Sequence, residues 1–538
     1  MTDRNSVRWI IPLLLFLLLF VFSYRYLTMW FMIDDMALIH AAASKSTFKM
    51  LFDRETYLTL YKFYYTPLFP LPFKIDWAIF KLNPTGYHVH NMIAVFLTAL
   101  AGYKVLRLYL PAFNAWIGTF LFAISYPNIS NIGWITMKHY IWGTFLILLS
   151  FYIFKKAEKL KSYVLYGISL ISFLAAMLMK EAFAPMPAAI FLLSSGNLKD
   201  RISKSFPFFS VLGLYFLLRY YFIGGMGGYL YIQTAKFDLF NMFIQNCKNI
   251  SFAVAVIWGS SWIFIAVILL FVIISPKKSW VFVALFLIWM SPFMLISAPD
   301  NDFGIFYFPP KLTLPLFALS AMAAYSSANA GARRKFIGYS LVTVLFFMQI
   351  LNLYRADGYI KNTSAHYRDI STEMRQRLKS GNVFIVDNDF PQFFSPYYEL
   401  LRLSRDDLKG ALAVTNLYGI PFMEPYLKNS RFVYLNGTWF DTNNQSLTPS
   451  PISDGSPPPD VVVQYNPPFV EGKITDSSKA EFVIANLNVI SESNILCQAF
   501  TVPPFINIRA GLKKKEEVYV YRKTGNVFSR PYRIKLPD

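Results

Sequence analysis

Long apolar stretches separated by short basic segments recur along the first two thirds of this 538-residue chain. The stretch from Trp9 to Phe31 is long enough to cross a bilayer as a helix, at about 1.5 Å per residue. Counting it, we find about 11 such stretches, which predicts a polytopic α-helical membrane protein. The later ones cover residues 88–108, 112–127, 139–154, 163–179, 183–195, 205–222, 251–274, 279–296, 312–328 and 335–353.

The composition agrees with a membrane protein and excludes a soluble globule. Hydrophobic residues make up 55% of the chain, aromatic residues 18% and charged residues only 15%. The net charge of +20 comes from basic residues clustered between apolar stretches, where they set the orientation of a membrane protein. Nucleic acid is therefore not needed as a partner to explain the charge.

The basic segments predict which loops face the cytoplasm. Arg4 and Arg8 precede the first stretch, which places the N-terminus inside and Asp34 outside. The first stretch lacks a small-residue cleavage site, so we interpret it as a retained anchor in the cytoplasmic (inner) membrane. The loops expected inside carry Lys104 and Arg107; Lys155, Lys156, Lys159 and Lys161; Lys199, Arg201 and Lys204; Lys277 and Lys278; and Arg333, Arg334 and Lys335.

Residues 57–82 are apolar enough to suggest a further span. Pro67, Pro70 and Pro72 are expected to break it, and a span here would invert the charge pattern that follows. We predict interfacial helices on the outer face within residues 34–87, as part of a membrane domain covering residues 1–354.

Residues 355–538 have the composition of a soluble domain, which the odd number of spans places outside the cytoplasm. Helical patterns at 370–380 and 395–412 alternate with β-like runs, so we predict an α+β fold. The β-like runs cover residues 382–388, 430–437, 460–466, 480–490 and 516–523. The segment 446–460 is too rich in Pro and Ser to pack and is expected to be mobile.

Two adjacent carboxylates, Asp34 and Asp35, follow the first apolar stretch and fall at the membrane–water boundary. Ionised groups at this depth cost several kcal/mol if they face lipid, so such residues are candidates for function. The alternative is an ordinary solvated start of a loop.

Cysteine and histidine give no metal-binding pattern. Cys247 and Cys497 both fall on the expected outer side, and whether they form a disulfide is left open. Among the five histidines only His88 and His90 are close in sequence, and hydrogen-bonded structural histidines are the simplest interpretation. No cofactor is predicted with certainty; a divalent cation held by Asp300 and Asp302 is one candidate, and solvated carboxylates are the alternative.

Four segments resemble the GT-C superfamily of integral membrane glycosyltransferases, within the branch of protein O-mannosyltransferases and related polyprenyl-phosphate-sugar enzymes. They are FYYTPLFPLPFKIDWAIFKLNPTGYHVHNMIAVFLTAL (63–100), YPNISNIGWITMKHYIW (126–142), MKEAFAPMP (179–187) and FYFPPKLTLPL (306–316). Each motif alone is weak, but their order and loop positions match, and the resemblance covers roughly residues 9–353. It implies sugar transfer from a polyprenyl-phosphate donor to an extracytoplasmic glycan, lipid or protein acceptor.

The resemblance also implies roles for single residues. It maps the general base of the family onto Asp34, with Asp35 beside it, and such a carboxylate typically contributes about 10²- to 10⁴-fold. Cations at outer helix ends would stabilise the departing lipid phosphate. The residues predicted to bind phosphate are therefore Lys138, Lys180, Arg219 and Lys311. The remaining candidates for substrate binding are His88, His139, Glu181 and Tyr307.

Each assignment has a simpler alternative. A lysine or arginine at a helix end commonly extends to the interface without binding a ligand, and Glu181 could pair with Lys180. The chain also lacks the arginine that many relatives carry before the Tyr-x-Pro loop, so Lys311 is the nearest replacement. Two other functions stay open: a transporter or flippase for lipid-linked glycans, and a non-catalytic envelope assembly protein. A transporter would show paired halves and charges at the membrane midplane, of which the sequence has little sign.

Overall fold

The computed structural model describes most of the helical part of the chain and the strands of the C-terminal part. The described residues are 3–32, 34–54, 57, 64–223, 244, 248, 251, 261–295, 309–329, 331–386, 397, 400, 410–415, 427, 429–435 and 438–443, followed by backbone strands at 461–466, 469–474, 481–489, 495–502, 505–509, 516–524, 527–528 and 532–534. They divide into two compact units, one of residues 1–31 and 41–365 and the other of residues 32–40 and 366–538. The predicted domain boundary at residue 354 lies inside one helix, α19 (Ala332–Leu378).

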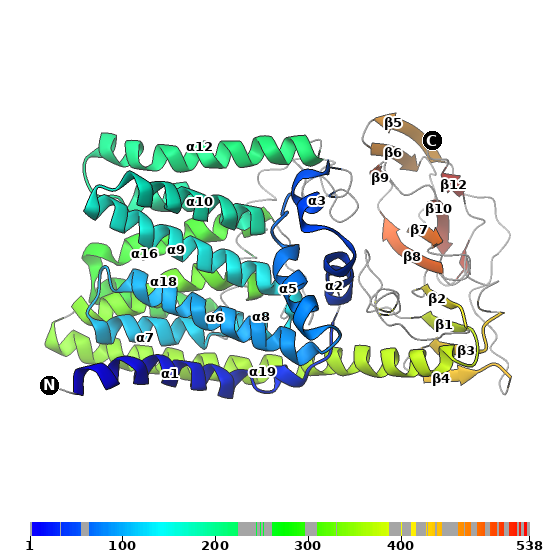
Figure 1. Cartoon of the computed structure of the whole chain (residues 1–538), viewed down its shortest axis with the longest axis horizontal. Helices are drawn as coiled ribbons and strands as arrows, with labels where there is room; N and C mark the ends of the chain where they lie inside the picture. Colours follow the sequence, from blue (N-terminus) through cyan, green and yellow to red (C-terminus); the bar gives the residue numbers. More distant parts are fainter. Residues whose placement is uncertain are drawn as a thin grey trace. The chain divides into compact units, whose positions relative to one another are not determined.

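The first unit is built from helices, and a helix lies in each of the predicted apolar stretches (Figure 1). They are α1 (Asp3–Ser23), α6 (Pro84–Leu106), α7 (Ala112–Ala123), α9 (Lys138–Leu160), α10 (Tyr163–Met179), α11 (Met186–Leu193), α12 (Leu198–Ile223), α15 (Ser261–Ile274), α16 (Pro276–Met290), α18 (Thr313–Asn329) and α19. Among the described residues, four segments are long and apolar enough to cross a membrane: Pro84–Leu106, Ile135–Leu160, Leu198–Ile223 and Arg334–Leu353. The total of about 11 spans stays a prediction.

The first helix ends earlier than the apolar stretch that predicts it. α1 stops at Ser23, whose hydroxyl donates to the Leu19 carbonyl at 2.6 Å, and a turn then leads into a short 3-10 helix, η1 (Tyr26–Thr28). Further along, the Trp30 amide donates to the Ser364 hydroxyl of α19 at 2.7 Å. The apolar residues after Ser23 therefore form a packed connection instead of the last turns of a helix.

Two of the prolines expected to break a span over residues 57–82, Pro70 and Pro72, lie in the first turn of a short helix, and Pro67 precedes it. Pro70 is the first residue of α5 (Pro70–Phe80), where a missing amide hydrogen costs nothing and the fixed φ angle suits a helix. α6 also begins with a proline, Pro84. Asn83 caps this helix, because its side chain accepts from the Thr85 amide at 3.2 Å. The interfacial position of α5 stays a prediction.

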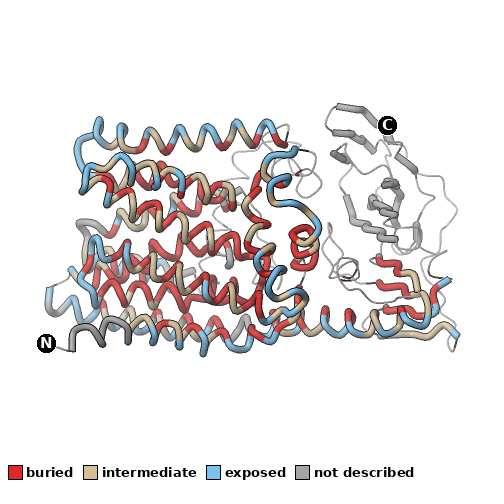
Figure 2. Tube along the Cα trace, viewed as in Figure 1, coloured by how far each residue is buried: buried red, intermediate tan, exposed pale blue. Residues whose placement is uncertain are grey.

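Small residues allow the helices to pack closely. A side chain at Gly143 of α9 would overlap the Phe183 ring in η3 (Glu181–Phe183), and one at Gly86 of α6 would overlap the Phe80 ring of α5. Buried residues concentrate in α8 (Tyr126–Gly133) and α18, whereas α12 keeps a largely exposed face (Figure 2). The core of this unit therefore runs along α6, α8, α9 and α18.

The second unit contains the start of α2 (Asp35–Ser44) and two sheets. The larger sheet has the strand order β11-β10-β7-β8-β2-β1-β3-β4, in which β8, β2, β1 and β3 pair in parallel and the other pairs are antiparallel. β12 pairs with β10, and a second, antiparallel sheet has the order β5-β6-β9. The strands are β1 (Val383–Val386), β2 (Leu412–Thr415), β3 (Phe432–Leu435), β4 (Thr438–Asp441), β5 (Val461–Asn466), β6 (Phe469–Ile474), β7 (Glu481–Val489), β8 (Ile495–Val502), β9 (Phe505–Arg509), β10 (Glu516–Thr524), β11 (Val527–Phe528) and β12 (Tyr532–Ile534).

Each of the five β-like runs contains a strand, namely β1, β3, β5, β7 and β10. The other strands were not predicted. The helical pattern at 395–412 lies mostly outside the described residues, but its last residue, Leu412, begins β2. The segment 446–460 also lies outside the described residues.

Candidate active site

The two acids Asp34 and Asp35 lie at the N-terminus of α2 in the second unit. Asp35 is fully buried, and its Oδ2 accepts from the Met32 amide at 2.8 Å while its own amide donates to the Met32 carbonyl at 2.9 Å. Asp34 is half-buried, and its carbonyl accepts from the Leu38 amide at 3.2 Å. The Asp35 carboxylate therefore holds the turn that begins α2, whereas Asp34 occupies the capping position before it.

In the helical unit, three charged side chains form what we call the ion cluster: Lys180, Glu181 and Arg219. α10 ends at Met179, and Lys180 takes an extended conformation that separates α10 from η3. Glu181 Oε1 lies 3.6 Å from Lys180 Nζ and 3.9 Å from a terminal nitrogen of Arg219, near the end of α12. Both contacts are longer than a hydrogen bond, so they are loose ion pairs.

The ion cluster leaves two polar groups unsatisfied within the described part of the chain. The Lys180 ammonium group makes no hydrogen bond to the described residues, and its side chain is 16% exposed. Glu181 Oε2 is buried and also has no hydrogen-bond partner among the described residues. A buried carboxylate oxygen without a hydrogen bond carries a desolvation cost that a ligand could remove.

Tyrosines surround the ion cluster. Lys180 Nζ lies 3.7 Å from the centre of the Tyr64 ring, a cation–π contact. Tyr57 donates to the Tyr64 carbonyl and accepts from the Thr66 amide at 2.7 Å, which fixes this segment. Burial raises the pKa of Tyr57, and the charge of Glu181 raises it further; burial also raises the pKa of Tyr65 to about 12. Both phenols therefore stay neutral hydrogen-bond donors at physiological pH.

His139 and Lys311 lie at the same end of the helical unit. The His139 ring, in the first turn of α9, has Nδ1 2.8 Å from the Thr136 carbonyl and its centre 4.4 Å from that of Phe69. Lys180 and Lys311 are both close enough to this ring to act on it electrostatically. Lys311 lies in the short 3-10 helix η5 (Pro309–Leu312) and is buried.

Lys138 is fully buried in an ion pair with Asp76 of α5, and its ammonium nitrogen lies 4.7 Å from the centre of the Phe73 ring. Asp76 Oδ1 also lies 2.5 Å from Nδ1 of His90. Lys138 was predicted to bind the donor phosphate. The structure instead shows its charge balanced inside the protein, and a role with phosphate stays a prediction.

His88 connects structural elements. Its Nδ1 lies 2.8 Å from the Ile132 carbonyl of α8, and its Nε2 lies 3.2 Å from the Met29 carbonyl. These contacts hold α6 against α8 and against the segment after α1. Its predicted role in substrate binding stays untested, and the geometry agrees with a structural histidine.

Several predicted residues lie outside the described part of the chain. They are Tyr307, Asp300, Asp302 and Cys247. Cys497 belongs to β8, of which only the backbone is described, so the disulfide stays open. No group of three or more His, Cys, Asp or Glu residues that could hold a metal occurs within the described residues.

Sequence reasoning missed Asp76, His90, Tyr57 and Tyr64 as members of the polar end. Asp76 was part of the quoted motif, but nothing in the sequence indicated which lysine would face it. The histidine pair drew attention to His88, whereas it is His90 that contacts a carboxylate. The two lie two residues apart on a helix and therefore point in different directions.

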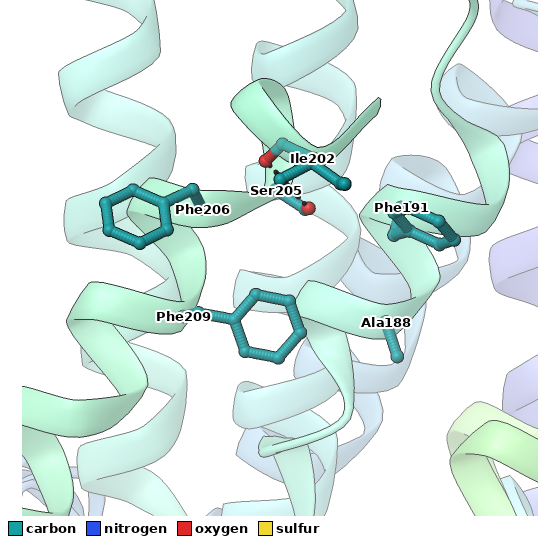
Figure 3. A pocket seen from close by; sticks show the side chains of 6 residues that line it. All are labelled: Ala188, Phe191, Ile202, Ser205, Phe206 and Phe209. Atoms are coloured by element: carbon teal, nitrogen blue, oxygen red, sulfur yellow. Dashed lines mark hydrogen bonds between the residues drawn. The ribbon is translucent and has the colours of Figure 1, made fainter. Parts of the chain in front are cut away.

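An apolar groove runs along α11, the helix that follows η3 in the chain. Its two parts share Ala188 and Phe209, and the first has a volume of about 330 Å³ between α11 and α12 (Figure 3). The second part opens beside Ala184 and Pro185, the residues directly after η3. The first part is lined by Ala188, Phe191, Ile202, Ser205, Phe206 and Phe209, and the second adds Leu287, Ile288 and Ser291 of α16 and η4 (Ser291–Leu295).

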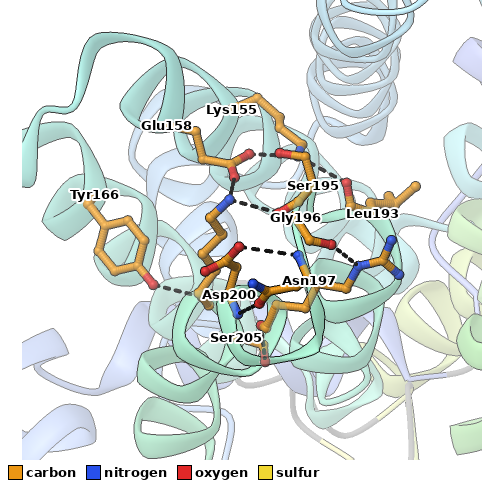
Figure 4. A network of polar contacts seen from close by, with 11 residues as sticks. Lys155, Glu158, Tyr166, Leu193, Ser195, Gly196, Asn197, Asp200 and Ser205 are labelled. Carbon is orange, nitrogen blue, oxygen red and sulfur yellow. Dashed lines mark hydrogen bonds and ion pairs between the residues drawn. The ribbon is translucent and has the colours of Figure 1, made fainter.

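The far end of the groove is fixed by a polar network (Figure 4). Glu158 of α9 pairs with Lys155 at 2.6 Å and with Lys204 of α12 at 2.8 Å. These lysines also donate to the carbonyls of Leu193 and Ser195, at 3.0 and 2.9 Å. The loop between α11 and α12 is thereby tied to the end of α9, at the end of the unit that carries the basic loops.

Comparisons with known proteins add little to this geometry. No protein-family model and no curated protein matches the sequence. Eleven chains of solved structures match the fold. One is the crystal structure of ArnT from Cupriavidus metallidurans in the apo state, with a TM-score of 0.45 and 12% identity, over 78% of this chain and 89% of that chain. At this TM-score the likeness decides neither fold nor activity.

Proposed function

We propose that this chain is an integral membrane glycosyltransferase of the GT-C type that transfers a sugar from a polyprenyl-phosphate donor to an acceptor outside the cytoplasm. The observation that carries the proposal is the ion cluster with its unsatisfied Lys180 ammonium and Glu181 carboxylate oxygen. An anionic phosphate would satisfy the first and a sugar hydroxyl the second. A glycosyl phosphate offers both groups in one ligand.

The apolar groove supports a lipid as the rest of that ligand. It begins at Ala184 and Pro185, which follow Glu181 of η3 closely in the chain, and continues to Phe191 and Ile202. Pro185 to Phe191 alone spans about 9 Å along a helix axis. Two cations together with apolar walls suit a phosphate headgroup that carries an isoprenoid tail. A free sugar phosphate would leave the apolar walls without a partner.

The cations would act on the leaving group. As the bond to the sugar breaks, the lipid phosphate gains negative charge, and preorganised donors stabilise that charge in a water-poor site. We assign this role to Lys180 and Arg219, with Lys311 nearby. Arg219 offers a fork of N–H donors that suits phosphate oxygens, and its side chain is only 5% exposed.

The general base is proposed from the sequence resemblance together with the local geometry of α2. The Asp35 carboxylate accepts from the Met32 amide, which fixes it in the turn that begins α2. We propose Asp34 as the base that takes the proton of the attacking hydroxyl, with Asp35 as a positioning residue. Attack from the face opposite the lipid phosphate would invert the anomeric carbon.

The proposed orientation follows from the charges at the two ends of the helical unit. The end of the helical unit opposite the ion cluster carries Lys155, Lys156, Lys159 and Lys161. We place this lysine-rich end in the cytoplasm. The ion cluster and residues 366–538 are then proposed to lie outside.

A change in the groove tests the lipid donor. Ala188→Phe should fill the part shared by the two halves of the groove, so transfer from a long-chain polyprenyl-phosphate sugar should fall, while transfer from a short-chain analogue is kept. Ile171→Phe, on an exposed face of α10, is the matched control and should affect neither donor. Equal loss with both donors would contradict a tail-binding groove.

A further inference from the structure

His90 uses one ring nitrogen in a contact inside the protein and leaves the other for a ligand. Its Nδ1 lies 2.5 Å from Oδ1 of Asp76, whose Oδ2 pairs with Lys138. In a neutral His90 ring the proton therefore lies on Nδ1, which donates to the Asp76 carboxylate. Its Nε2 is then a lone-pair acceptor, with no hydrogen bond to any described residue, on a side chain that is 15% exposed.

Trp142 of α9 supplies the complementary group. Its ring meets that of His90 edge to face, with the centres 5.7 Å apart. The indole Nε1–H is buried and has no hydrogen-bond partner in the described part of the chain. An indole nitrogen can only donate, so an unsatisfied donor and an unsatisfied acceptor lie on neighbouring rings.

The geometry points to a carbohydrate-binding subsite at His90 and Trp142. A hydroxyl group can donate to Nε2 of His90 and accept from Nε1 of Trp142, and adjacent hydroxyls of one sugar ring can serve both. An ammonium group could satisfy only the acceptor, and a carboxylate or an unprotonated phosphate only the donor. The indole ring adds an apolar face against which a sugar ring can pack.

Asp76 and Lys138 act as positioning groups for this subsite. Both are fully buried and touch the ligand only through His90, whose tautomer they fix. Three elements meet here: α5 brings Asp76, α6 brings His90, and α9 brings Lys138 and Trp142. The subsite rests on the proposed function in one respect: that function supplies the sugar, either as part of the donor or as part of the acceptor.

The test uses diethyl pyrocarbonate, which modifies unprotonated imidazole nitrogens, on the purified full-length protein, with peptide mass spectrometry to resolve each histidine. His90 should react faster than His88, both of whose nitrogens contact carbonyls. At least one of a panel of free monosaccharides (glucose, galactose, mannose, arabinose and N-acetylglucosamine) should slow modification of His90 several-fold without slowing His139.

Trp142→Phe separates a ligand site from a structural contact. It keeps a ring beside His90 and removes only the N–H donor, so His90 should react as before, but the protection by sugar should be lost. Trp116→Phe, a tryptophan stacked on Tyr103, is the matched control and should keep the protection.

Two outcomes would overturn the subsite. One is a His90 that does not react faster than His88, which would mean that Nε2 is not open. The other is a reactive His90 that none of the sugars protects, in which case the two nitrogens hold only water. Either outcome leaves the proposed transferase intact, because transfer from a lipid donor is measured separately.

Discussion

The ammonium nitrogen of Lys180 lies 3.7 Å from the centre of the Tyr64 ring, so the ring covers one side of this cation. The Lys180 ammonium group makes no hydrogen bond to the described residues. A cation–π contact attracts the ammonium group without using its N–H donors. The N–H groups of Lys180 are thereby left to donate to an anion. This relationship makes Lys180 the sharpest test of the phosphate site.

Lys180→Gln should weaken the use of a polyprenyl-phosphate donor by roughly 10- to 100-fold, because a hydrogen bond to a charged group contributes about 1.5–3 kcal/mol. The measurement is kcat/KM for sugar transfer. Lys156→Gln is the matched control, since Lys156 also lies over a tyrosine, Tyr152, at 5.0 Å, but at the opposite end of the unit. Equal effects of the two changes would contradict a localised phosphate site.

Lys138 should matter for folding more than for donor binding. Lys138→Met leaves the Asp76 carboxylate buried without its cation, and breaking a buried pair in this way costs about 3–5 kcal/mol. The double change Asp76→Asn with Lys138→Met removes both charges and should be less destabilised than Lys138→Met alone. Thermal unfolding of the purified variants measures both. A fully stable Lys138→Met that has lost donor binding would instead restore Lys138 to the phosphate site.

Gly143 should be required for the close approach of α9 to η3, which carries Glu181. Gly143→Ala places a methyl group where the Phe183 ring now lies, so it should lower stability by about 1–3 kcal/mol and disturb the ion cluster. Gly167→Ala in α10 is the control, because no atom lies within 4 Å of the added methyl, and it should be neutral or slightly stabilising. Denaturant or thermal unfolding compares the two. A neutral Gly143→Ala would show that Phe183 can move aside at no cost.

The helical part of the fold could be predicted because long apolar stretches leave few alternatives in a membrane. The ends of helices were less predictable. Residues 24–31 continue the apolar stretch of α1, yet they form a connection in which the Trp30 amide donates to Ser364, more than 300 residues away in the chain. The prolines of residues 57–82 were expected to break a span, but that Pro70 would begin a short helix was not predicted.

The candidate site was predicted in part. Lys180 and Arg219 were named from their positions at helix ends and Glu181 from the motif around residues 179–187, and the structure brings these three together. Lys138 had the same position in sequence, but its partner Asp76 lies 62 residues away, so its pairing could not be read from local pattern. His90 was missed for the same reason, because its importance comes from Asp76 and Trp142 on two other helices.

Sugar transfer by the Asp34→Asn variant tests the central claim most directly. The change keeps the size of the side chain and removes the proton acceptor, so the folded protein should bind a polyprenyl-phosphate donor normally but lose transfer by about 10²- to 10⁴-fold. Asp35→Asn should lose less, since an amide oxygen can still accept from the Met32 amide. Near wild-type transfer by Asp34→Asn would reject Asp34 as the base, and the absence of transfer from any polyprenyl-phosphate donor by the unaltered protein would contradict the glycosyltransferase itself.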